Sequence, residues 1–237
     1  MTDEEIRVAA LEFAKRNKSR IAKELTDQAK YAPDVVPVSV FMAGSPGAGK
    51  TEFSKILIEL LEQNKEHRVI RIDGDEIRSQ VPGYTGNNSK LFQGAISLIV
   101  ERMHDNALQH KQSFVFDGTL SNYEKATKNI KRSLDKKRSV FIFYMYQKPN
   151  IAWKFTQARE KTEGRNIPKM AFIKQFFGAK EAVSKIFEEF GDKVEIYLVK
   201  RDFERNTNMV KIGGSTIKNI DDYIQESYTS DDLEKLL

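Results

Sequence analysis

The segment GSPGAGKT, which runs from Gly44 to Thr51, constrains the fold of this chain more than any other feature. It matches the pattern G-x-x-x-x-G-K-[ST] at every fixed position. An apolar run from Val36 to Met42 precedes it and predicts a buried strand, and an amphipathic helix follows it. A strand, a glycine loop and a helix in this order form a cradle for phosphate, because backbone N–H groups and the helix N-terminus attract anionic oxygens. The sequence therefore predicts a site for a nucleoside triphosphate and Mg²⁺.

We expect the whole loop to bind the nucleotide, through Gly44, Ser45, Pro46, Gly47, Ala48, Gly49, Lys50 and Thr51. Within it, the Lys50 ammonium group would reach the β- and γ-phosphates, and the Thr51 hydroxyl would bind Mg²⁺. The loop pattern does not distinguish ATP from GTP as the phosphate donor, and it does not identify the acceptor.

The overall composition is that of a globular protein. Hydrophobic residues make up 40% of the 237 residues and charged residues 31%, which is enough apolar material for a core. The absence of cysteine excludes disulfides, a thiolate zinc site and a cysteine nucleophile. The N-terminus is acidic, and no apolar run approaches the roughly 20 residues that span a bilayer, so we expect neither a signal peptide nor a membrane segment. We therefore expect a cytoplasmic protein with no membrane partner.

The formal net charge of +5 is unevenly distributed along the chain. The run from Lys125 to Arg138 is strongly basic, whereas the segment from Asp221 to Leu237 is acidic. The basic run contains no aromatic residue that could stack on a nucleic-acid base, so we interpret it as the solvated face of a helix. Net charge alone is weak support for a polyanionic partner, and we do not expect nucleic acid to be the partner.

Apolar runs typical of buried strands alternate with helical periods along the chain. The five candidate strands are Val36–Met42, Arg68–Ile72, Ser113–Phe116, Ser139–Tyr146 and Val194–Val199. This alternation predicts an α/β domain of the P-loop NTPase or kinase fold, with a mostly parallel five-stranded sheet and helices on both faces. We expect one domain over residues 1–237, in which residues 34–201 form the core.

Helical additions are expected outside this core. Residues 1–33 would form an N-terminal helical segment. A second helix would run from Pro168 to Phe190, with proline at its start, Gly191 just past its end, and aromatic residues that pack into the core. The C-terminal segment, residues 202–237, would contain either a last helix or a frayed tail from Tyr223 onward.

Polar side chains follow two of the predicted strands at the points where those strands end. Asp73 and Asp75 follow the second strand, and Asp117 and Thr119 follow the third. Ligands of open α/β sheets gather at the carboxyl ends of the strands, so the carboxylates would hold Mg²⁺ or accept a proton from a substrate hydroxyl. The alternative is that Asp73 or Asp75 caps the helix that follows.

Three further charged residues are candidates for the site. Glu101 lies on the face of a predicted helix opposite its apolar stripe, where it would face either solvent or a cleft. Arg159 and Arg165 flank the end of a helix that starts near Pro149, on either side of a glycine. Because guanidinium groups match phosphate oxygens, these arginines would form a lid over the transferred phosphate, and exposed surface positions are the alternative.

From about Phe13 to about Arg201 the chain resembles the zeta toxins, a family of P-loop kinases in bacterial toxin–antitoxin systems. The resemblance rests on the order and spacing of several motifs. They are the loop Gly44–Thr51, IDGDEIR from Ile72 to Arg78 with Pro82 and Tyr84 after it, Glu101, Asp117-Gly118-Thr119, Arg159, and RNIP from Arg165 to Pro168. Zeta toxins phosphorylate the 3′-hydroxyl of the amino sugar in UDP-N-acetylglucosamine, so the resemblance implies a nucleotide-sugar substrate.

On the acceptor side, the resemblance implies that Asp75 is the general base that accepts the proton of the sugar hydroxyl. It also implies that Glu101 binds the sugar nucleotide from across the cleft and that Thr119 lines the site. This chain has Val81 where family members often have histidine. A related nucleotide sugar, or a different hydroxyl of the same substrate, is therefore an open alternative for the acceptor.

On the phosphate side, the resemblance implies that Lys50, Arg159 and Arg165 hold the transferred phosphoryl group. Thr51 would bind Mg²⁺, and Asp117 would lie between the metal and the substrate as a further metal ligand. Asp117 stands where family members often have glutamate.

Two other functions stay open from the sequence. A polynucleotide 5′-hydroxyl kinase uses a similar P-loop core with a strand-end aspartate, and the basic run favours it slightly. A nucleotide-controlled binding module is the other, although two lid arginines in the same chain favour phosphoryl transfer. Family membership further implies an antitoxin protein, for which the N-terminal helical segment is a candidate contact. Packing of that segment against the domain's own sheet is the alternative.

Overall fold

The computed structural model describes residues 1–63, 68–164, 166–200, 208–212, 220, 224 and 227–237. Within these ranges the strands form a six-stranded sheet in the order β2-β3-β1-β4-β5-β6. The first five strands are parallel, and β6 pairs with β5 in the antiparallel direction. The prediction of an α/β fold with a mostly parallel sheet is confirmed.

The strands are β1 (Val38–Ala43), β2 (Ile70–Asp73), β3 (Phe114–Asp117), β4 (Ser139–Tyr146), β5 (Glu195–Lys200) and β6 (Asn208–Ile212). Each of the first five begins and ends within two residues of a run predicted from the sequence. The sequence analysis missed β6 because this short strand contains Asn208 and Lys211 and has no continuous apolar run.

The helices are α1 (Asp3–Leu25), α2 (Lys50–Glu62), α3 (Gly74–Arg78), α4 (Ser89–Gln109), α5 (Tyr123–Asp135), α6 (Pro149–Glu163), α7 (Lys169–Phe190), the 3₁₀ turn η1 (Gly191–Lys193) and α8 (Ser230–Leu236). Pro168 and Gly191 flank α7 as predicted. The C-terminal tail ends in a helix, α8, which Thr229 caps through its side chain.

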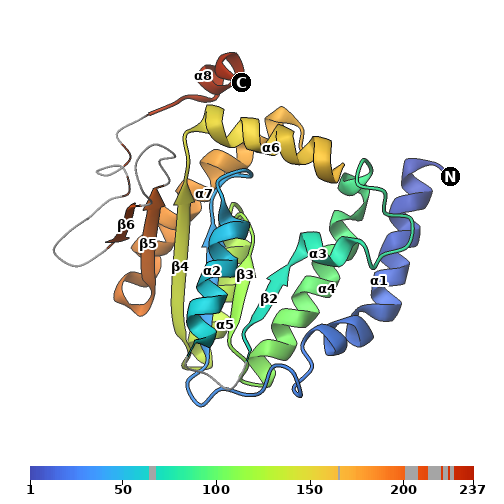
Figure 1. The fold of residues 1–237 in the computed structure, drawn as a ribbon, viewed down its shortest axis with the longest axis vertical. Helices are drawn as coiled ribbons and strands as arrows, with labels where there is room; N and C mark the ends of the chain where they lie inside the picture. The colour runs from blue at the N-terminus through green and yellow to red at the C-terminus, as the bar shows by residue number, and fades with distance from the viewer. Residues whose placement is uncertain (64–67, 165, 201–207, 213–219, 221–223, 225–226) are drawn as a thin grey trace.

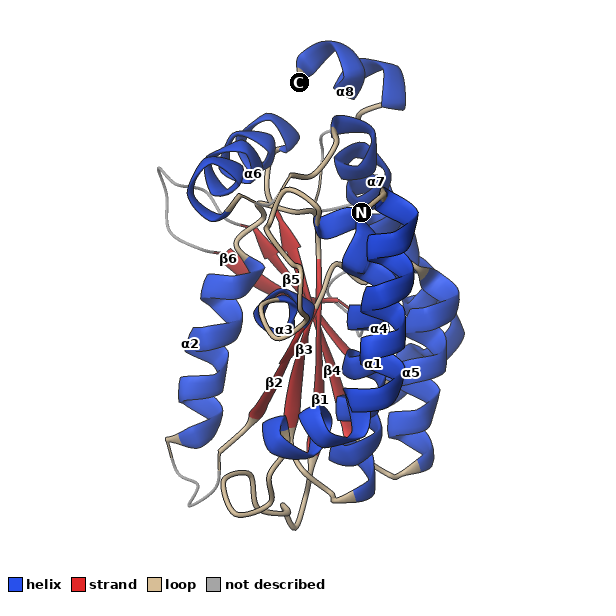
Figure 2. Ribbon diagram, turned by 90° about the vertical axis from the view of Figure 1, so that its right-hand side faces the viewer, coloured by secondary structure: helices blue, strands red, loops and turns tan. Residues whose placement is uncertain are grey.

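Helices cover both faces of the sheet, as Figure 2 shows: α2 lies on one side, and α1, α4, α5 and α7 lie on the other. The side chains of successive β1 residues point alternately to the two faces of the sheet. Phe41 packs into the larger core, whereas Val40 and Met42 pack into the smaller core with Phe53 and Leu57 of α2. Burial on both faces explains why the parallel strands are apolar at nearly every position.

The N-terminal helix α1 packs against α4 (Figure 1) and not directly on the sheet. Small side chains, Ala10, Ala14 and Ala22, are buried at this contact and allow the two helices to approach closely. Thr2 caps α1 in a reciprocal capping box with Glu5. Within the described residues, no helix is both long enough and apolar enough to cross a membrane.

A buried histidine on α4 lies against the sheet. His104 is 1% exposed, and its ring meets those of Phe114 and Phe116 edge to face. Its Nδ1 lies 3.4 Å from a guanidinium nitrogen of Arg132, and its Nε2 has no hydrogen-bond partner among the described residues. Burial, with the positive charges of Arg132 and Arg138, lowers the pKa of His104 from its ordinary 6.5 to about 3. The folded protein therefore keeps His104 neutral throughout the mildly acidic range.

This neutral histidine makes the stability of the fold depend on pH. Below pH 6.5 the His104 side chain binds a proton in the unfolded chain, whereas in the folded protein it stays unprotonated down to about pH 3. The free energy of unfolding therefore falls as the pH falls through this window. Between about pH 7.5 and about pH 5, urea unfolding should show a loss roughly 2 kcal/mol larger in the wild type than in His104→Leu. Equal losses in the two proteins would assign the acid sensitivity to other groups.

Candidate functional site

The glycine loop connects β1 to α2 at the carboxyl edge of the sheet (Figure 1). The backbone N–H of Gly44 donates to the carbonyl oxygen of Thr119, 3.1 Å away, which ties the loop to the end of β3. Gly44 has φ 131°, and a Cβ atom there would overlap the carbonyl oxygen of Met145 in β4. The loop can run this close to β4 only because residue 44 is glycine.

The first turn of α2 carries the two loop residues with functional side chains. Lys50 Nζ donates to the carbonyl oxygens of Gly44 at 3.0 Å and Ser45 at 2.7 Å, so its ammonium group lies against the loop's own backbone. Thr51 is the next residue, in a turn whose N–H groups lack helical acceptors and favour anions. This geometry suits a phosphate cradle, and nucleotide binding by residues 44–51 stays a prediction.

Helix α6 crosses above the carboxyl ends of the strands (Figure 1) and packs directly on the glycine loop. A Cβ atom at Gly47, whose φ is 70°, would overlap the Ala152 carbonyl oxygen and lie 2.8 Å from Thr156 Oγ1. Arg159 follows Ala152 by seven residues and Thr156 by three, so all three share one helix face. The close contact at Gly47 therefore fixes the distance between the glycine loop and the helix face that carries Arg159.

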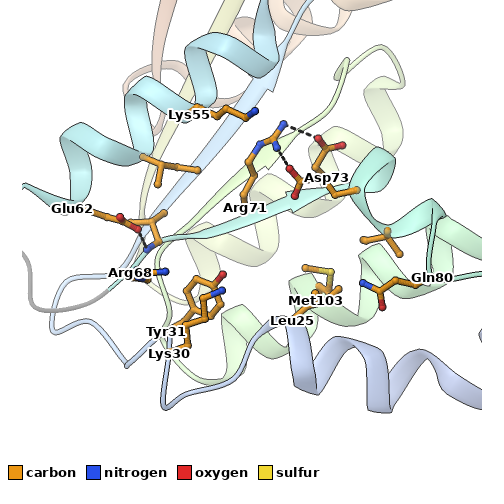
Figure 3. A pocket seen from close by; sticks show the side chains of 14 residues that line it. Leu25, Lys30, Tyr31, Lys55, Glu62, Arg68, Arg71, Asp73, Gln80 and Met103 are labelled. Carbon is orange, nitrogen blue, oxygen red and sulfur yellow. Dashed lines mark hydrogen bonds and ion pairs between the residues drawn. The ribbon is translucent and has the colours of Figure 1, made fainter. Parts of the chain in front are cut away.

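Two predicted site carboxylates lie side by side at the ends of neighbouring strands. Asp73 of β2 is paired with Asp117 of β3 in the sheet register. Adjacent like charges on one face of a sheet repel each other, and Arg71 offsets this repulsion. Its Nη2 donates to Oδ2 of both carboxylates at 2.6 Å, and its Nη1 pairs with Glu76. Figure 3 shows the guanidinium group of Arg71 beside Asp73 on β2, which is an edge strand of the sheet.

A hydrogen-bonded chain connects this carboxylate pair to the glycine loop. Ser54 Oγ lies 2.8 Å from Asp117 Oδ2 and 3.0 Å from the carbonyl oxygen of Thr51. Ser54 has one hydroxyl proton and can donate it to only one of these two oxygens at a time, but Arg71 Nε donates to Ser54 Oγ at 3.2 Å. On the other side, Asp73 Oδ1 accepts from the backbone N–H of Asp75 at 2.8 Å. Asp73 thus caps α3, which is the alternative that the sequence pattern left open. Ser54, Arg71 and Asp73 therefore connect the backbone carbonyl of Thr51 to the backbone N–H of Asp75.

The oxygen atoms around Ser54 suit a magnesium ion that is shared with phosphates. Mg²⁺ binds through one or two carboxylates and hydroxyl groups together with nucleotide oxygens. Ser54 Oγ contacts Asp117 Oδ2 and the backbone carbonyl of Thr51, so the first turn of α2, which carries Thr51, lies beside Asp117. Every contact of the Asp117 carboxylate with the described residues uses Oδ2.

The predicted general base, Asp75, lies next to a buried cation. Arg78 Nη2 lies 3.5 Å from Asp75 Oδ1 and donates to Gln93 of α4 at 3.2 Å. The Arg78 side chain is only 7% exposed, and its Nε and Nη1 have no hydrogen-bond partner in the described part of the chain. Among the described residues, the contacts of this buried guanidinium group are therefore with Asp75 and Gln93.

The remaining predicted residues lie in different surroundings. Thr119 belongs to the loop after β3, where its Oγ1 lies 2.9 Å from Ser121 Oγ. This loop packs closely on α7, because a Cβ atom at Gly178 would lie 2.8 Å from the Ser121 carbonyl oxygen. Glu101 is exposed on α4, in agreement with its predicted place opposite the apolar stripe. Arg165 lies outside the described residues.

Sequence reasoning missed Ser54, Arg71, Arg78 and the docking face of α6. A signal existed for Arg71, because it alternates with Ile70 and Ile72 in β2 and therefore faces the same side as Asp73. Arg78 belongs to the motif that carried the family resemblance, but the motif gave it no role. Nothing in the sequence pattern indicated that α6 would approach the backbone of the glycine loop.

Comparisons with known proteins bear on the fold and the family. A family model described as zeta toxin matches residues 21–218. No curated protein matches the chain. A chain in the structure of the PezAT chromosomal toxin–antitoxin system of the human pathogen Streptococcus pneumoniae is 19% identical, with a TM-score of 0.67 over 100% of this chain and 96% of that chain. A chain in the AvrRxo1-ORF1:-ORF2 structure with ATP is 14% identical, with a TM-score of 0.62 over 93% and 71% of the two chains. At these identities the structural matches establish the fold.

The packing of α6 on the loop gives a testable expectation. Gly47→Ala should weaken ATP binding by about tenfold or more, because a side chain at positive φ costs roughly 1–2 kcal/mol and the added methyl group also overlaps Ala152. Gly94→Ala is the matched control, since its Cβ atom would only touch Leu11 at 3.7 Å. Isothermal titration calorimetry with ATP on the folded variants measures both affinities. Equal affinities for the two variants would contradict the expectation.

Proposed function

Because this chain belongs to the zeta toxin family, we propose that it is a kinase that phosphorylates a nucleotide sugar. It would transfer the γ-phosphate of ATP or GTP to the 3′-hydroxyl of the amino sugar in UDP-N-acetylglucosamine or a related compound. One observation carries the proposal: a hydrogen-bonded chain through Ser54, Arg71 and Asp73 joins the backbone of Thr51 in the glycine loop to the backbone of Asp75. This chain supports a donor phosphate and an acceptor base within a single site.

On the acceptor side, Asp75 would accept the proton of the attacking hydroxyl group. The adjacent Arg78 supports this role, because its buried guanidinium group lies 3.5 Å from Asp75 Oδ1 and helps to hold that carboxylate in place. Glu101 and Thr119 would bind the sugar nucleotide. Positioning and electrostatics would supply most of the catalysis, since phosphoryl transfer requires little covalent chemistry from the protein.

On the donor side, Lys50, Arg159 and Arg165 would stabilise the negative charge of the transferred phosphoryl group. The place of Arg159 on the face of α6 that docks on the loop supports its share of this role. Thr51 and Asp117 would hold Mg²⁺, which supplies positive charge to the phosphate oxygens when it is bound.

An antitoxin protein is the partner that we propose. Family membership supports it, and the structures similar in fold include the PezAT toxin–antitoxin system and the two-component AvrRxo1-ORF1:-ORF2 complex. The outward face of α1 is the candidate contact, because α4 occupies its inward face while Val8 is 45% exposed.

Incubation of the protein with Mg²⁺ and either ATP or GTP tests the acceptor. Mass spectrometry of a nucleotide-sugar mixture should show a gain of one phosphate on UDP-N-acetylglucosamine or a close relative. A 5′-hydroxyl RNA in a parallel reaction should stay unmodified. Phosphorylation of the RNA with no change in any nucleotide sugar would replace the proposal with a polynucleotide kinase.

Substitution of two residues tests the assigned roles. Lys50→Ala and Asp75→Ala should each lower kcat/KM for transfer by about 100-fold or more, with melting temperatures close to that of the wild type. Asp135→Asn, at the exposed end of α5, is the control and should retain full activity. Wild-type turnover by Asp75→Ala would remove Asp75 from the role of general base.

A further inference from the structure

We propose that Arg71 is a positioning residue that holds Asp117 by one carboxylate oxygen and keeps the other turned toward the magnesium–nucleotide complex. This inference deepens the proposed function and rests on it. Neither the glycine-loop pattern nor the motifs shared with the family include position 71. The role comes from the contacts that Arg71 makes in the fold.

The contacts of Arg71 reach four different elements. Its Nη2 donates to Asp73 of its own strand and to Asp117 of β3, each at 2.6 Å. Its Nε donates to Ser54 Oγ of α2 at 3.2 Å, and its Nη1 pairs with Glu76 of α3. These four contacts occupy four of the five N–H groups of a guanidinium, so the orientation of the side chain is fixed by its partners.

Asp117 is held from one side only. Both Arg71 Nη2 and Ser54 Oγ lie within hydrogen-bond distance of its Oδ2, and no contact with the described residues uses Oδ1. Carboxylates that bind metals are typically oriented by hydrogen bonds of this kind to the oxygen that does not face the metal. Because Ser54 and Thr51 lie three residues apart in α2, the contact of Ser54 with Asp117 also holds the first turn of α2 beside this carboxylate.

The interaction is largely shielded from water. The Arg71 side chain is 10% exposed and that of Asp117 is 4% exposed. Because an arginine side chain is charged at any pH at which proteins are folded, Arg71 acts as a permanent counter-ion for the carboxylates of Asp73, Asp117 and Glu76.

A cavity beside β2 offers Arg71 a different role, the binding of an anionic ligand. This cavity has a volume of about 440 Å³, and Lys55, Arg68 and Arg71 line it together with Asp73 and other side chains (Figure 3). The geometry favours the positioning role, because the N–H groups of Arg71 already serve protein oxygens, whereas Arg68 makes no ion pair among the described residues. Arg68 is therefore the matched control, as a cation in the same cavity without contact to Asp117.

The test compares Arg71→Met, Arg71→Lys and Arg68→Met with the wild type. For each protein, the Mg²⁺ concentration for half-maximal transfer and the KM of the acceptor are measured. The affinity of the ADP-bound protein for Mn²⁺ is measured by electron paramagnetic resonance. Arg71→Met should raise the Mg²⁺ requirement and weaken Mn²⁺ binding by about tenfold or more, with a change of less than about threefold in the acceptor KM. Arg71→Lys should recover part of the loss, and Arg68→Met should leave all three values unchanged.

Two results would overturn the inference. A raised acceptor KM with unchanged metal binding would make Arg71 a ligand contact at the cavity, and a lower melting temperature alone would make it structural. If Arg71→Met does not fold, the variants Arg71→Lys and Ser54→Ala test the inference instead. Each weakens one hydrogen-bond donor to Asp117 Oδ2, so each should weaken Mn²⁺ binding. Mn²⁺ binding needs no acceptor. Failure of the wild type to phosphorylate any nucleotide sugar would therefore count against the proposed function. The Mn²⁺ affinity of the Arg71 variants would still test the positioning role of Arg71.

Discussion

A positive charge between two carboxylates is the interaction on which this site depends. Asp73 and Asp117 are forced together because they end adjacent parallel strands in register and face the same side of the sheet. Two ionised carboxylates at this spacing would repel each other, and each would turn away from the site. Arg71 bonds to both at 2.6 Å and converts the repulsion into a fixed arrangement. The same guanidinium group also contacts Ser54 of α2 and Glu76 of α3, so two strands and two helices meet at this one side chain.

The proposed phosphate side and the proposed acceptor side of the site are built differently. The glycine loop is held by backbone packing: Gly44 runs against β4, and Gly47 packs against the backbone of α6. Backbone packed this closely leaves little room for a side chain at either glycine. The proposed acceptor side consists of side chains on α3 and α4, among them Asp75, Arg78 and the exposed Glu101. In this proposal, substitutions on α3 and α4 would change the acceptor while the glycine loop stays the same.

Much of this arrangement could be predicted from the amino-acid sequence. The five parallel strands, the glycine loop, the caps of α7 and the outward place of Glu101 follow from local patterns, because the period of apolar residues and the chemistry of glycine and proline act over a few neighbouring positions. The same rules placed Asp73, Asp75 and Asp117 at strand ends, and therefore at one edge of the sheet. They could not find β6, whose five residues carry too little apolar signal.

The sequence by itself determined that a strand, a glycine loop and a helix follow one another in the order typical of a phosphate cradle, and which carboxylates lie near this loop, since a motif and its flanking elements are local properties. Only the tertiary structure decided how these groups are oriented. Arg71 meets Asp117 across 46 positions of sequence, Ser54 meets Asp117 across 63, and α6 meets the glycine loop about a hundred residues after it. Contacts of this range depend on the order of strands in the sheet and on the close packing of helices over it, and neither leaves a periodic trace in the residues concerned.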